Sequence, residues 1–368
     1  MCEFGILTDN IKTIFAVLNN NCMLKIFSSF VLFMFFSFGL LAQNDQFKAI
    51  SVGFYNLENL FDFERDTTIR DSEFTPWGKR AWTEEKYKEK QANMAYVISQ
   101  LGIDVTPAGL SILGVSEIEN KRVLEDLVKQ ESIADRNYQI VHRDSPDRRG
   151  IDVALLYNPA HFNVTDVKME NINFLVNEGD TLRTREIMHV VGVLDGDTTH
   201  VLVNHWPSRS GGEKRSSPRR NKAAQKCTMI IDSLKALNPD VKVLVIGDLN
   251  DDPTSTSTKG ILRAKGKIKD VSEKDMFNPM YDYYRRGLGS NAYRDNWSLF
   301  DQIILSPGYL DKEQDGYFFY KAIIFNKKYL IQRSGQYKGY PFRTFSGDKY
   351  QGGYSDHFPV FVYLVKKV

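Results

Sequence analysis

The sequence predicts a single α/β domain, and three observations lead to that prediction. Short apolar runs typical of buried strands recur along the chain and outnumber the stretches with helical spacing. After residue 43, no internal repeat and no linker long enough to separate two domains is visible. Of the 368 residues, 42% are hydrophobic, which is enough to build a large core. The predicted domain covers residues 43–368.

The first 42 residues differ from the rest. Lys25 is followed by an uncharged apolar block over residues 26–42, in which Leu40 and Ala42 form a small-residue cleavage pattern. This pattern predicts a signal peptide beginning at Met23 after a short upstream segment, and therefore a secreted or periplasmic protein without a membrane span. The alternative is a retained membrane anchor, although the block is at the short limit for a helix that crosses a bilayer.

Charge and cysteine content exclude two classes of protein. Lys and Arg total 48 against 46 Asp and Glu, so the net charge excludes a strongly basic nucleic-acid binder. Of the three cysteines only Cys227 follows the predicted cleavage site, so the mature chain cannot form an internal disulfide. We expect a monomer that depends on its core for stability.

In the first half of the domain, strands and helices alternate. Apolar residues alternate at Ile50, Val52 and Phe54, as in a half-buried strand, and Thr83 is a favourable N-cap for the helix behind it. The predicted elements are, in order, a strand (47–62), a surface loop (66–82), a helix (86–100), a strand (110–120), a helix (121–130), a short strand (138–142) and a strand entered from a basic turn (148–159). We interpret Arg148 and Arg149 in that turn as surface charges.

In the second half, further strands surround one long helix. The predicted elements are, in order, two strands (184–194 and 199–204), a helix (219–237), a buried strand (243–247), a strand (303–305), a loop (337–354) and a last strand after His357. The run from Glu213 to Lys222 carries five basic residues in ten, which is compatible with nucleic-acid binding. A solvated loop leading into the helix explains the run equally well.

Polar groups stand at the ends of five predicted strands. They are Asn56 with Glu58, Glu117, Asn204 with His205, Asp248 with Asn250, and Asp356 with His357. Their recurrence at strand ends indicates a shared site. Oxygen ligands without a thiolate indicate Mg²⁺, Mn²⁺ or Ca²⁺ rather than Zn²⁺, and the histidines could transfer protons or bind a phosphoryl oxygen.

Six motifs occur in one order: YNLEN, SEIEN, VNHWPSR, GDLND, FDQIILS and SDHFPV. Together they resemble the endonuclease/exonuclease/phosphatase superfamily over about residues 47–365. The resemblance implies a four-layer α/β sandwich, in which two packed, mostly antiparallel β-sheets are flanked by helices. It also implies a deoxyribonuclease-like, metal-dependent phosphodiesterase.

The resemblance further implies a role for each motif residue. Asp248 would orient or deprotonate the attacking water, with Asn250 helping to position it. His357 would be the catalytic histidine, held in one tautomer by Asp301, and His205 would contact the phosphate or assist the leaving group. The implied metal ligands are Asn56, Glu117 and Asp356, and the candidate contacts to the substrate phosphate are Arg209 and Glu58.

We therefore expect a secreted, Mg²⁺-dependent endonuclease or exonuclease acting on DNA or RNA. The basic run after His205 favours such a polyanionic substrate. One alternative is a phosphatase, or a phospholipid or sphingomyelin phosphodiesterase, with the same chemistry. The other is a binding protein that has kept the fold and lost catalysis.

Overall fold

The computed structural model describes residues 46–172, 174–177, 180–182 and 184–368. All helices and strands of this part of the chain fall within one unit, Phe47–Lys367. The predicted upstream segment and signal peptide lie outside the described residues. In the part of the chain that is described, no helix has the length and apolar character needed to cross a membrane.

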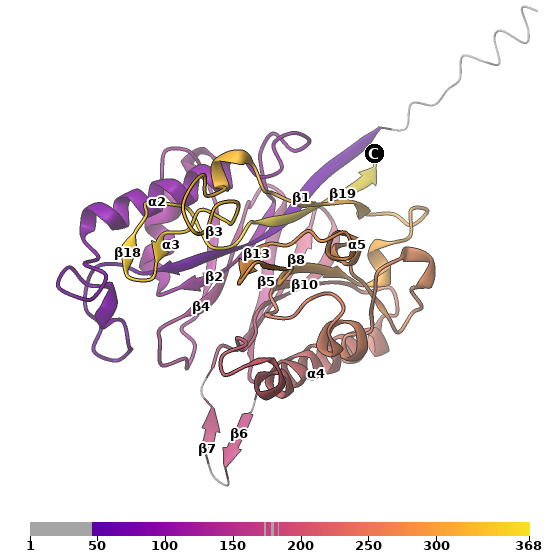
Figure 1. Ribbon diagram of the computed structural model, residues 1–368. Coiled ribbons are helices and arrows are strands. Elements are labelled where there is room, and N and C mark those ends of the chain that lie inside the picture. Colours follow the sequence, from indigo (N-terminus) through magenta and orange to yellow (C-terminus); the bar gives the residue numbers. More distant parts are fainter. Residues whose placement is uncertain (1–45, 173, 178–179, 183) are drawn as a thin grey trace, which may run out of the picture. The chain divides into compact units, whose positions relative to one another are not determined.

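The first of two large sheets has β1 and β2 at its centre (Figure 1). Only the β1–β2 pair is parallel, and the other neighbours are antiparallel. The strand order is β16 (Phe318–Ile324), β19 (Val360–Lys367), β1 (Phe47–Leu60), β2 (Ile112–Ile118), β4 (Asp152–Tyr157) and β3 (Gln139–His142).

The second sheet is centred on β10, the apolar strand that ends in Asp248. Two of its pairs, β9–β10 and β11–β12, are parallel and the rest are antiparallel. The strand order is β11 (Ala264–Lys265), β12 (Met276–Phe277), β15 (Asp301–Leu305), β10 (Lys242–Asp248), β9 (Asp197–His205), β8 (Ile187–Leu194) and β5 (Phe162–Glu170). Both sheets are therefore mostly antiparallel, as predicted.

Smaller elements lie in the connections between the strands of the two sheets. Three two-stranded hairpins are β6 (Phe174–Asn177) with β7 (Asp180–Leu182), β13 (Asn291–Tyr293) with β14 (Asn296–Ser298), and β17 (Phe345–Ser346) with β18 (Lys349–Tyr350). Short helical turns are η1 (Ser72–Phe74), η2 (Ala134–Arg136), η3 (Thr256–Ile261), η4 (Ile268–Asp270), η5 (Pro307–Tyr309) and η6 (Lys328–Leu330). Strand β5 was not predicted, because polar residues interrupt its apolar positions and leave it half exposed.

The two sheets pack face to face, and their inner faces share one hydrophobic core. Gly114 of β2 lies against Ile246 of β10, where an added Cβ would come within 2.6 Å of the Ile246 Cδ1 atom. A larger residue at position 114 would require the Ile246 side chain to move, since interiors pack without spare volume. The close approach brings the ends of strands from both sheets near one another.

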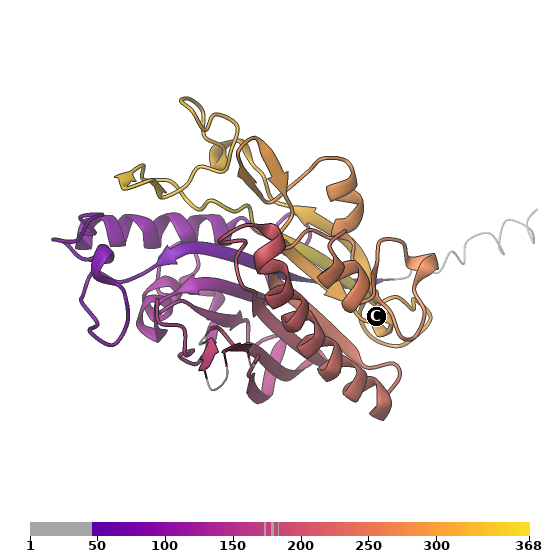
Figure 2. The same ribbon diagram turned by 60° about the horizontal axis from the view of Figure 1, so that its bottom comes forward.

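Helices flank the sheets and complete the layers. Helices α2 (Glu84–Ser99) and α3 (Lys121–Val128) join the core of the first sheet. Helix α4 (Glu213–Leu237) packs Ala223, Cys227 and Ile231 against the second sheet (Figure 2). A short helix, α5 (Met280–Arg285), precedes β13. The helix–sheet–sheet–helix order confirms the predicted α/β sandwich.

Helix α4 begins at Glu213, six residues before its predicted start. Pro218 lies inside the helix, where a proline normally disfavours helical structure. The first turns are held because Ser216 donates to the carbonyl of Gly212 and the guanidinium of Arg220 pairs with Glu213 at 2.8 Å. The interpretation of the basic run as a solvated loop is therefore wrong, since the run is the first part of α4.

Candidate active site

Three neighbouring strands of the second sheet end in line with one another. Asp248 at the end of β10 pairs in register with His205 of β9 on one side and with Asp301 of β15 on the other. All three residues are buried. Residues paired in register share a face of the sheet, so the pairing alone puts an imidazole and two carboxylates side by side.

The facing strands of the first sheet break their regular pairing at the same place. Asn56 of β1 pairs with Ser116 of β2, and the register shifts just beyond them. Glu58, Asn59 and Glu117 then adopt positive φ angles of 47°, 53° and 59°. Residues other than glycine rarely adopt this conformation. It occurs most often at functional sites, where surrounding contacts stabilise it.

Asn56 connects the two sheets through its side-chain amide. Its Nδ2 atom donates to Oε1 of Glu117 at 3.2 Å and to Oδ2 of Asp248 at 3.1 Å. The backbone N–H of Asn59 donates to the other Glu117 oxygen at 3.1 Å. The Glu117 and Asp248 carboxylates, which come from different sheets, are thus fixed on either side of one amide.

The turn after β10 fixes Asp248. Oδ1 of Asp248 accepts from the backbone N–H of Asn250 at 2.9 Å, and the Asn250 side chain donates to the carbonyl of Trp206 at 2.9 Å. Burial, followed by repulsion from Asp301, raises the pKa of Asp248 to about 7 against the opposing effect of His357. This carboxyl group can therefore exchange a proton near neutral pH.

His357 and Asp301 form a tight pair. The Nδ1 atom of His357 lies 2.6 Å from Oδ2 of Asp301, and its Nε2 atom faces Oδ2 of Asp248 at 4.0 Å. Burial alone would lower the pKa of His357, but the carboxylates of Asp301, Asp248 and Asp356 outweigh it and hold that pKa well above its ordinary value. The pair favours an imidazolium whose Nε2–H points toward Asp248.

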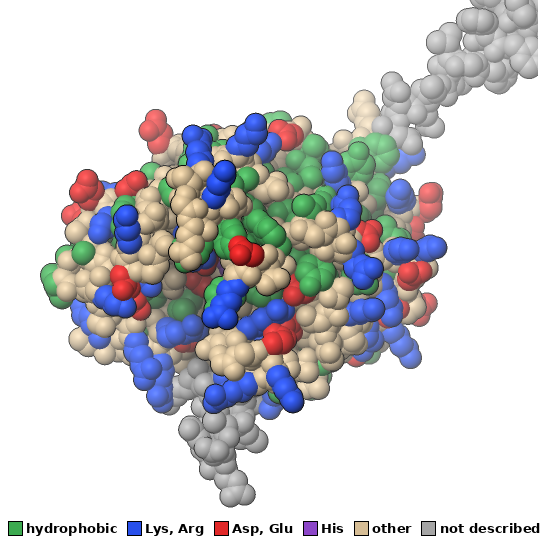
Figure 3. Space-filling model, in the orientation of Figure 1, with side chains coloured by type: hydrophobic (Ala, Val, Ile, Leu, Met, Phe, Trp, Pro, Cys, Tyr) green, Lys and Arg blue, Asp and Glu red, His purple; other side chains and the backbone are tan. Residues whose placement is uncertain are grey.

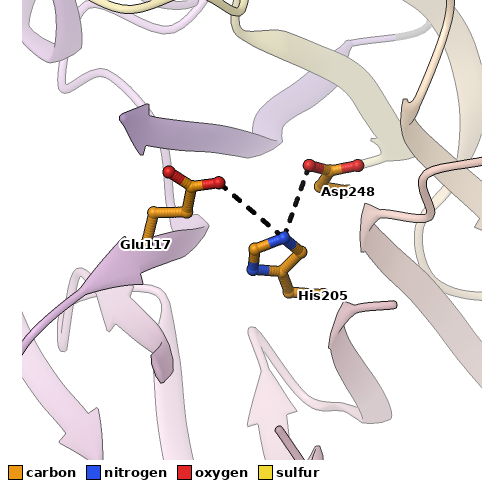
Figure 4. A group of neighbouring side chains, drawn as sticks. All are labelled: Glu117, His205 and Asp248. Atoms are coloured by element: carbon orange, nitrogen blue, oxygen red, sulfur yellow. Dashed lines mark ion pairs between the residues drawn. The ribbon is translucent and has the colours of Figure 1, made fainter. Parts of the chain in front are cut away.

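His205 has the opposite electrostatic environment. Figure 4 shows its ring between Glu117 and Asp248, with Nε2 at 3.8 Å from Oε1 of Glu117 and 3.7 Å from Oδ2 of Asp248. Burial, then the positive charges of Arg185 and Arg149, hold the pKa of His205 well below its ordinary value. The ring is therefore neutral, and its buried Nδ1 atom has no hydrogen-bond partner among the described residues.

Arg185 is a site residue that the sequence reasoning missed. The guanidinium is buried and donates to the backbone carbonyls of His205 and Trp206 at 3.2 and 2.9 Å. Its third contact is Asp147 at 2.7 Å, which also pairs with Arg149 at 2.9 Å. Arg149 is therefore an ion-paired part of this cluster rather than only a surface charge, and no motif around Arg185 could have revealed its role.

Glu58 anchors a loop near the site. Its Oε2 atom accepts from the backbone N–H of Thr344 at 2.6 Å, and the buried Lys90 donates to the hydroxyl of the same threonine at 2.6 Å. Burial, then Asp356, raises the pKa of Glu58 to about 7. Since a carboxylate repels phosphate, this environment favours an anchoring role, and the phosphate contact stays a prediction.

Arg209 contacts the chain's own acids. Its guanidinium pairs with Glu213 at 2.8 Å, Asp252 at 2.9 Å and Asp251 at 3.3 Å, and also donates to the carbonyl of Asn250. These contacts tie the turn after β10 to the start of α4. A phosphate would have to compete with three carboxylates for this arginine, so the phosphate role of Arg209 also stays a prediction.

One side-chain group of this site fits a divalent cation. The ligand atoms of Glu117, His205 and Asp248 lie within 4.8 Å of one another. Those of Asp248, Asp301 and His357 are equally close, but a protonated His357 has no free nitrogen for a metal ion. Carboxylates with one imidazole suit Mg²⁺ or Mn²⁺, and the unpartnered Nδ1 atom of His205 leaves that ring free to adopt either tautomer. Among the described residues, Asp356 belongs to neither group.

Asp356 has a different observed partner. Its Oδ2 atom accepts from Nη2 of Arg343 at 3.1 Å. The carboxylate nevertheless lies close enough to raise the pKa values of Glu117 and His357. Its effect on the site is electrostatic in this structure, and its role as a metal ligand stays a prediction.

Comparison with known proteins identifies the family. A family model described as the Endonuclease/Exonuclease/phosphatase family matches residues 51–366. The chain belongs to this family. Its members are phosphoesterases and nucleases that generally depend on divalent metal ions. The predicted family is therefore confirmed, whereas no curated protein sequence matches the chain.

Solved structures of this family share the fold. An endonuclease/exonuclease/phosphatase family protein from Bacteroides thetaiotaomicron is 16% identical to this chain. The match covers 88% of this chain and 100% of that chain, with a TM-score of 0.52. A mannosyl-6-phosphatase from the same organism is also 16% identical, with 86% and 99% covered and a TM-score of 0.51. A humanized D. rerio TDP2 is 11% identical, with 86% and 98% covered and a TM-score of 0.50.

The surface of the molecule carries both signs of charge. Figure 3 shows Lys and Arg side chains spread over one face, with Asp and Glu side chains between them. Within the basic run of α4, Lys214, Arg215 and Arg219 are exposed, whereas Arg220 is fully buried and pairs with Asp251 at 2.7 Å. The run therefore offers less exposed positive charge than its sequence suggested.

Proposed function

We propose that the chain is a divalent-metal-dependent hydrolase of phosphodiester bonds. One observation carries this proposal. The Oδ2 atom of Asp248 faces Nδ2 of Asn56 at 3.1 Å, Nε2 of His205 at 3.7 Å and Nε2 of His357 at 4.0 Å. A carboxylate oxygen surrounded by groups that can donate hydrogen bonds is suited to hold a water molecule next to a phosphoryl group.

In this proposal Asp248 orients the attacking water and accepts its proton. A pKa of about 7 matches that task, because the carboxylate is ionised at slightly alkaline pH and still basic enough to take a proton. The Asn250 N–H holds the other carboxylate oxygen, so the side chain cannot rotate away. The function of this pair is alignment of the water with the phosphorus atom.

The two histidines then have different tasks. His357, kept protonated by Asp301, donates from Nε2 to a phosphoryl oxygen and stabilises the charge that develops there. His205, kept neutral by burial and by two arginines, hydrogen-bonds a phosphoryl or leaving-group oxygen without adding charge. Their opposite pKa shifts support this division of roles.

Glu117 would hold the divalent cation. The ligand role of Asn56 stays a prediction, because its Oδ1 atom accepts from the backbone N–H of Glu58 at 2.9 Å and its Nδ2 atom faces the carboxylates. When bound, the cation would neutralise charge on the phosphoryl oxygens and lower the pKa of a coordinated water. The chain prepares the Glu117 carboxylate by fixing both of its oxygens, one through Asn56 and one through the N–H of Asn59. We propose Mg²⁺ or Mn²⁺ as the ion.

The proposed substrate class is nucleic acid. Exposed basic residues at the start of α4 support a polyanionic substrate, although Arg220 is buried against Asp251 and Arg209 is already paired with Asp252. Export of the chain remains a proposal that rests on the apolar block at residues 26–42.

A substrate panel tests the proposal. The purified protein is incubated with single-stranded DNA, RNA, sphingomyelin and p-nitrophenyl phosphate, each with Mg²⁺, with Mn²⁺ and with EDTA. We expect cleavage of DNA or RNA that EDTA abolishes. Release of phosphate from the monoester alone would replace the proposal with a phosphatase, and cleavage of sphingomyelin alone would replace it with a lipid phosphodiesterase. Failure to cleave any substrate with either metal would contradict hydrolysis altogether.

A further inference from the structure

A cleft of about 340 Å³ is lined by residues 292–295, 336–337, 340 and 343. It lies between the β13–β14 hairpin and the loop at residues 336–343. Asn291 at the start of β13 places its Nδ2 atom 3.5 Å from Nε2 of His357, and its neighbour Ala292 lines the cleft. On the other side, Arg343 lines the cleft and pairs with Asp356, which precedes His357 in the chain. The cleft is therefore connected to the proposed reaction centre through Asn291 and through the Arg343–Asp356 pair.

The walls of this cleft are fixed by hydrogen bonds and aromatic contacts. Arg294 and Asp295 adopt φ angles of 49° and 62°, as a two-residue type I′ hairpin turn requires. The Tyr340 hydroxyl donates to Asp295 at 2.6 Å, which joins the loop to the hairpin. Trp297 lies between Tyr340 and Phe358, with ring centroids 6.2 and 5.9 Å apart. Figure 2 shows the two segments side by side near the top of the view.

The lining combines one exposed and two half-buried tyrosine rings with guanidinium groups. Tyr293 is 70% exposed, and the Arg294 guanidinium lies 5.3 Å from the centre of its ring. Tyr337 lies across the cleft, with the Arg343 guanidinium 5.9 Å from its ring centre. Among the described residues Arg294 has no acidic partner. Tyrosine faces and arginine planes bind nucleobases by stacking, and an unpaired arginine attracts a neighbouring phosphate.

A sugar ring would find fewer partners here. Carboxylates are strong acceptors for sugar hydroxyls, and the lining carries one, that of Asp295, beside the amide of Gln336 and the tyrosine hydroxyls. This carboxylate already accepts from the Tyr340 hydroxyl. The volume lies at the lower end of the range for small-molecule pockets, which suits a single planar ring better than an extended chain.

We propose that this cleft binds the base of the nucleotide next to the scissile phosphate, with the base stacked on Tyr337 and Tyr293 and Arg294 facing the adjoining phosphate. The inference rests on the proposed phosphodiester hydrolysis and narrows its substrate to nucleotides. The cleft would then determine which phosphoester the reaction centre receives.

Binding measured without turnover tests the inference separately from hydrolysis. Affinities for adenosine 5′-monophosphate, ribose 5-phosphate and a hexose 6-phosphate are measured by calorimetry in EDTA. Base stacking is worth about 1–3 kcal/mol, which corresponds to roughly 5-fold or more in affinity. We expect the nucleotide to bind tighter than ribose 5-phosphate by that factor. Tyr337→Ala should reduce the ratio toward one, whereas Tyr337→Phe, which keeps the ring, should preserve it.

Tyr320→Ala is the matched control, because Tyr320 is 63% exposed but lies on β16, outside this cleft. Its affinity ratio should equal that of the wild type. Equal affinities for nucleotide and ribose 5-phosphate, or a ratio unaffected by Tyr337→Ala, would overturn the inference even if the protein hydrolyses phosphodiesters. Tighter binding of the hexose phosphate would assign the cleft to sugars instead. Tyr337-dependent nucleotide binding by a protein without hydrolytic activity would refute the proposed function and the substrate role of the cleft.

Discussion

Replacing Asp248 by asparagine should separate activity from stability. Asparagine keeps an oxygen that can accept from the Asn250 N–H, so the turn after β10 should survive. The new amide group would face Nδ2 of Asn56 at the position where an acceptor now stands 3.1 Å away, and it cannot take a proton from water. General-base catalysis contributes about 10²- to 10⁴-fold, and we expect kcat to fall by roughly 10³-fold with a smaller change in KM.

Although Asp248→Asn should lower kcat, it should not lower the free energy of unfolding. The pKa of Asp248 is raised from 3.8 to about 7 in the folded state. Above pH 7 the Asp248 carboxylate is therefore charged in both states, but its charge is less favourable in the folded state than in the unfolded state. That difference corresponds to a folding cost of roughly 4 kcal/mol at alkaline pH, which disappears below about pH 4, where both states are protonated. The donor–donor contact with Asn56 offsets part of the gain. In EDTA at pH 8 we expect the variant to be at least as stable as the wild type.

The assays are initial rates of DNA cleavage with Mg²⁺ and urea unfolding in EDTA. Asp270→Asn is the control, because Asp270 is an exposed acid in η4, and it should change neither rate nor stability. A variant Asp248→Asn that kept near-normal kcat would refute the assignment of Asp248 as base. Loss of activity together with a large loss of stability would refute the separation of the two effects.

Three further predictions concern the histidine pair, a buried ion pair and the metal. Asp301→Asn removes the carboxylate that chiefly raises the pKa of His357, so the alkaline limb of the pH–rate profile should move to lower pH; an unchanged limb would contradict the assignment. Arg220→Met leaves Asp251 buried with only Arg209 and Ser257, and should lower the free energy of unfolding by about 3 kcal/mol in urea; a loss below about 1 kcal/mol would contradict this account. EDTA should abolish turnover and added Mg²⁺ or Mn²⁺ should restore it, and full activity in EDTA would exclude the metal role.

The sequence alone predicted much of this site because its motifs stand at strand ends. The polar residues Asn56, Glu117 and Asp248 were visible as breaks at the ends of apolar runs, and His357 was visible just before the last apolar run. Their convergence depends on strand pairing, which a single sequence does not encode locally. Asp301 lies beside Asp248 because β15 is the antiparallel neighbour of β10, and no spacing along the chain indicates that pairing. Asp301 meets His357, which precedes β19 of the other sheet, only because the two sheets pack face to face.

What the sequence could not predict are charged residues whose burial depends on tertiary contacts. Lys90 looks like an ordinary helix-surface lysine, yet it is fully buried against Thr344. Arg220 belongs to a run of otherwise exposed charges. Its burial depends on the start of α4 at Glu213, which pairs with the Arg220 guanidinium. Arg185 lies in no motif, although it donates to the backbone carbonyls of both His205 and Trp206.

Hydrolysis of a DNA oligonucleotide in H₂¹⁸O tests the central claim most directly. If Asp248 directs water to phosphorus, each cleavage carried out with Mg²⁺ should put one ¹⁸O atom into the terminal phosphate of the product. Mass spectrometry should find that label in the wild-type reaction and no cleavage in EDTA. Absence of cleavage, or label in the product alcohol instead of the phosphate, would contradict the account.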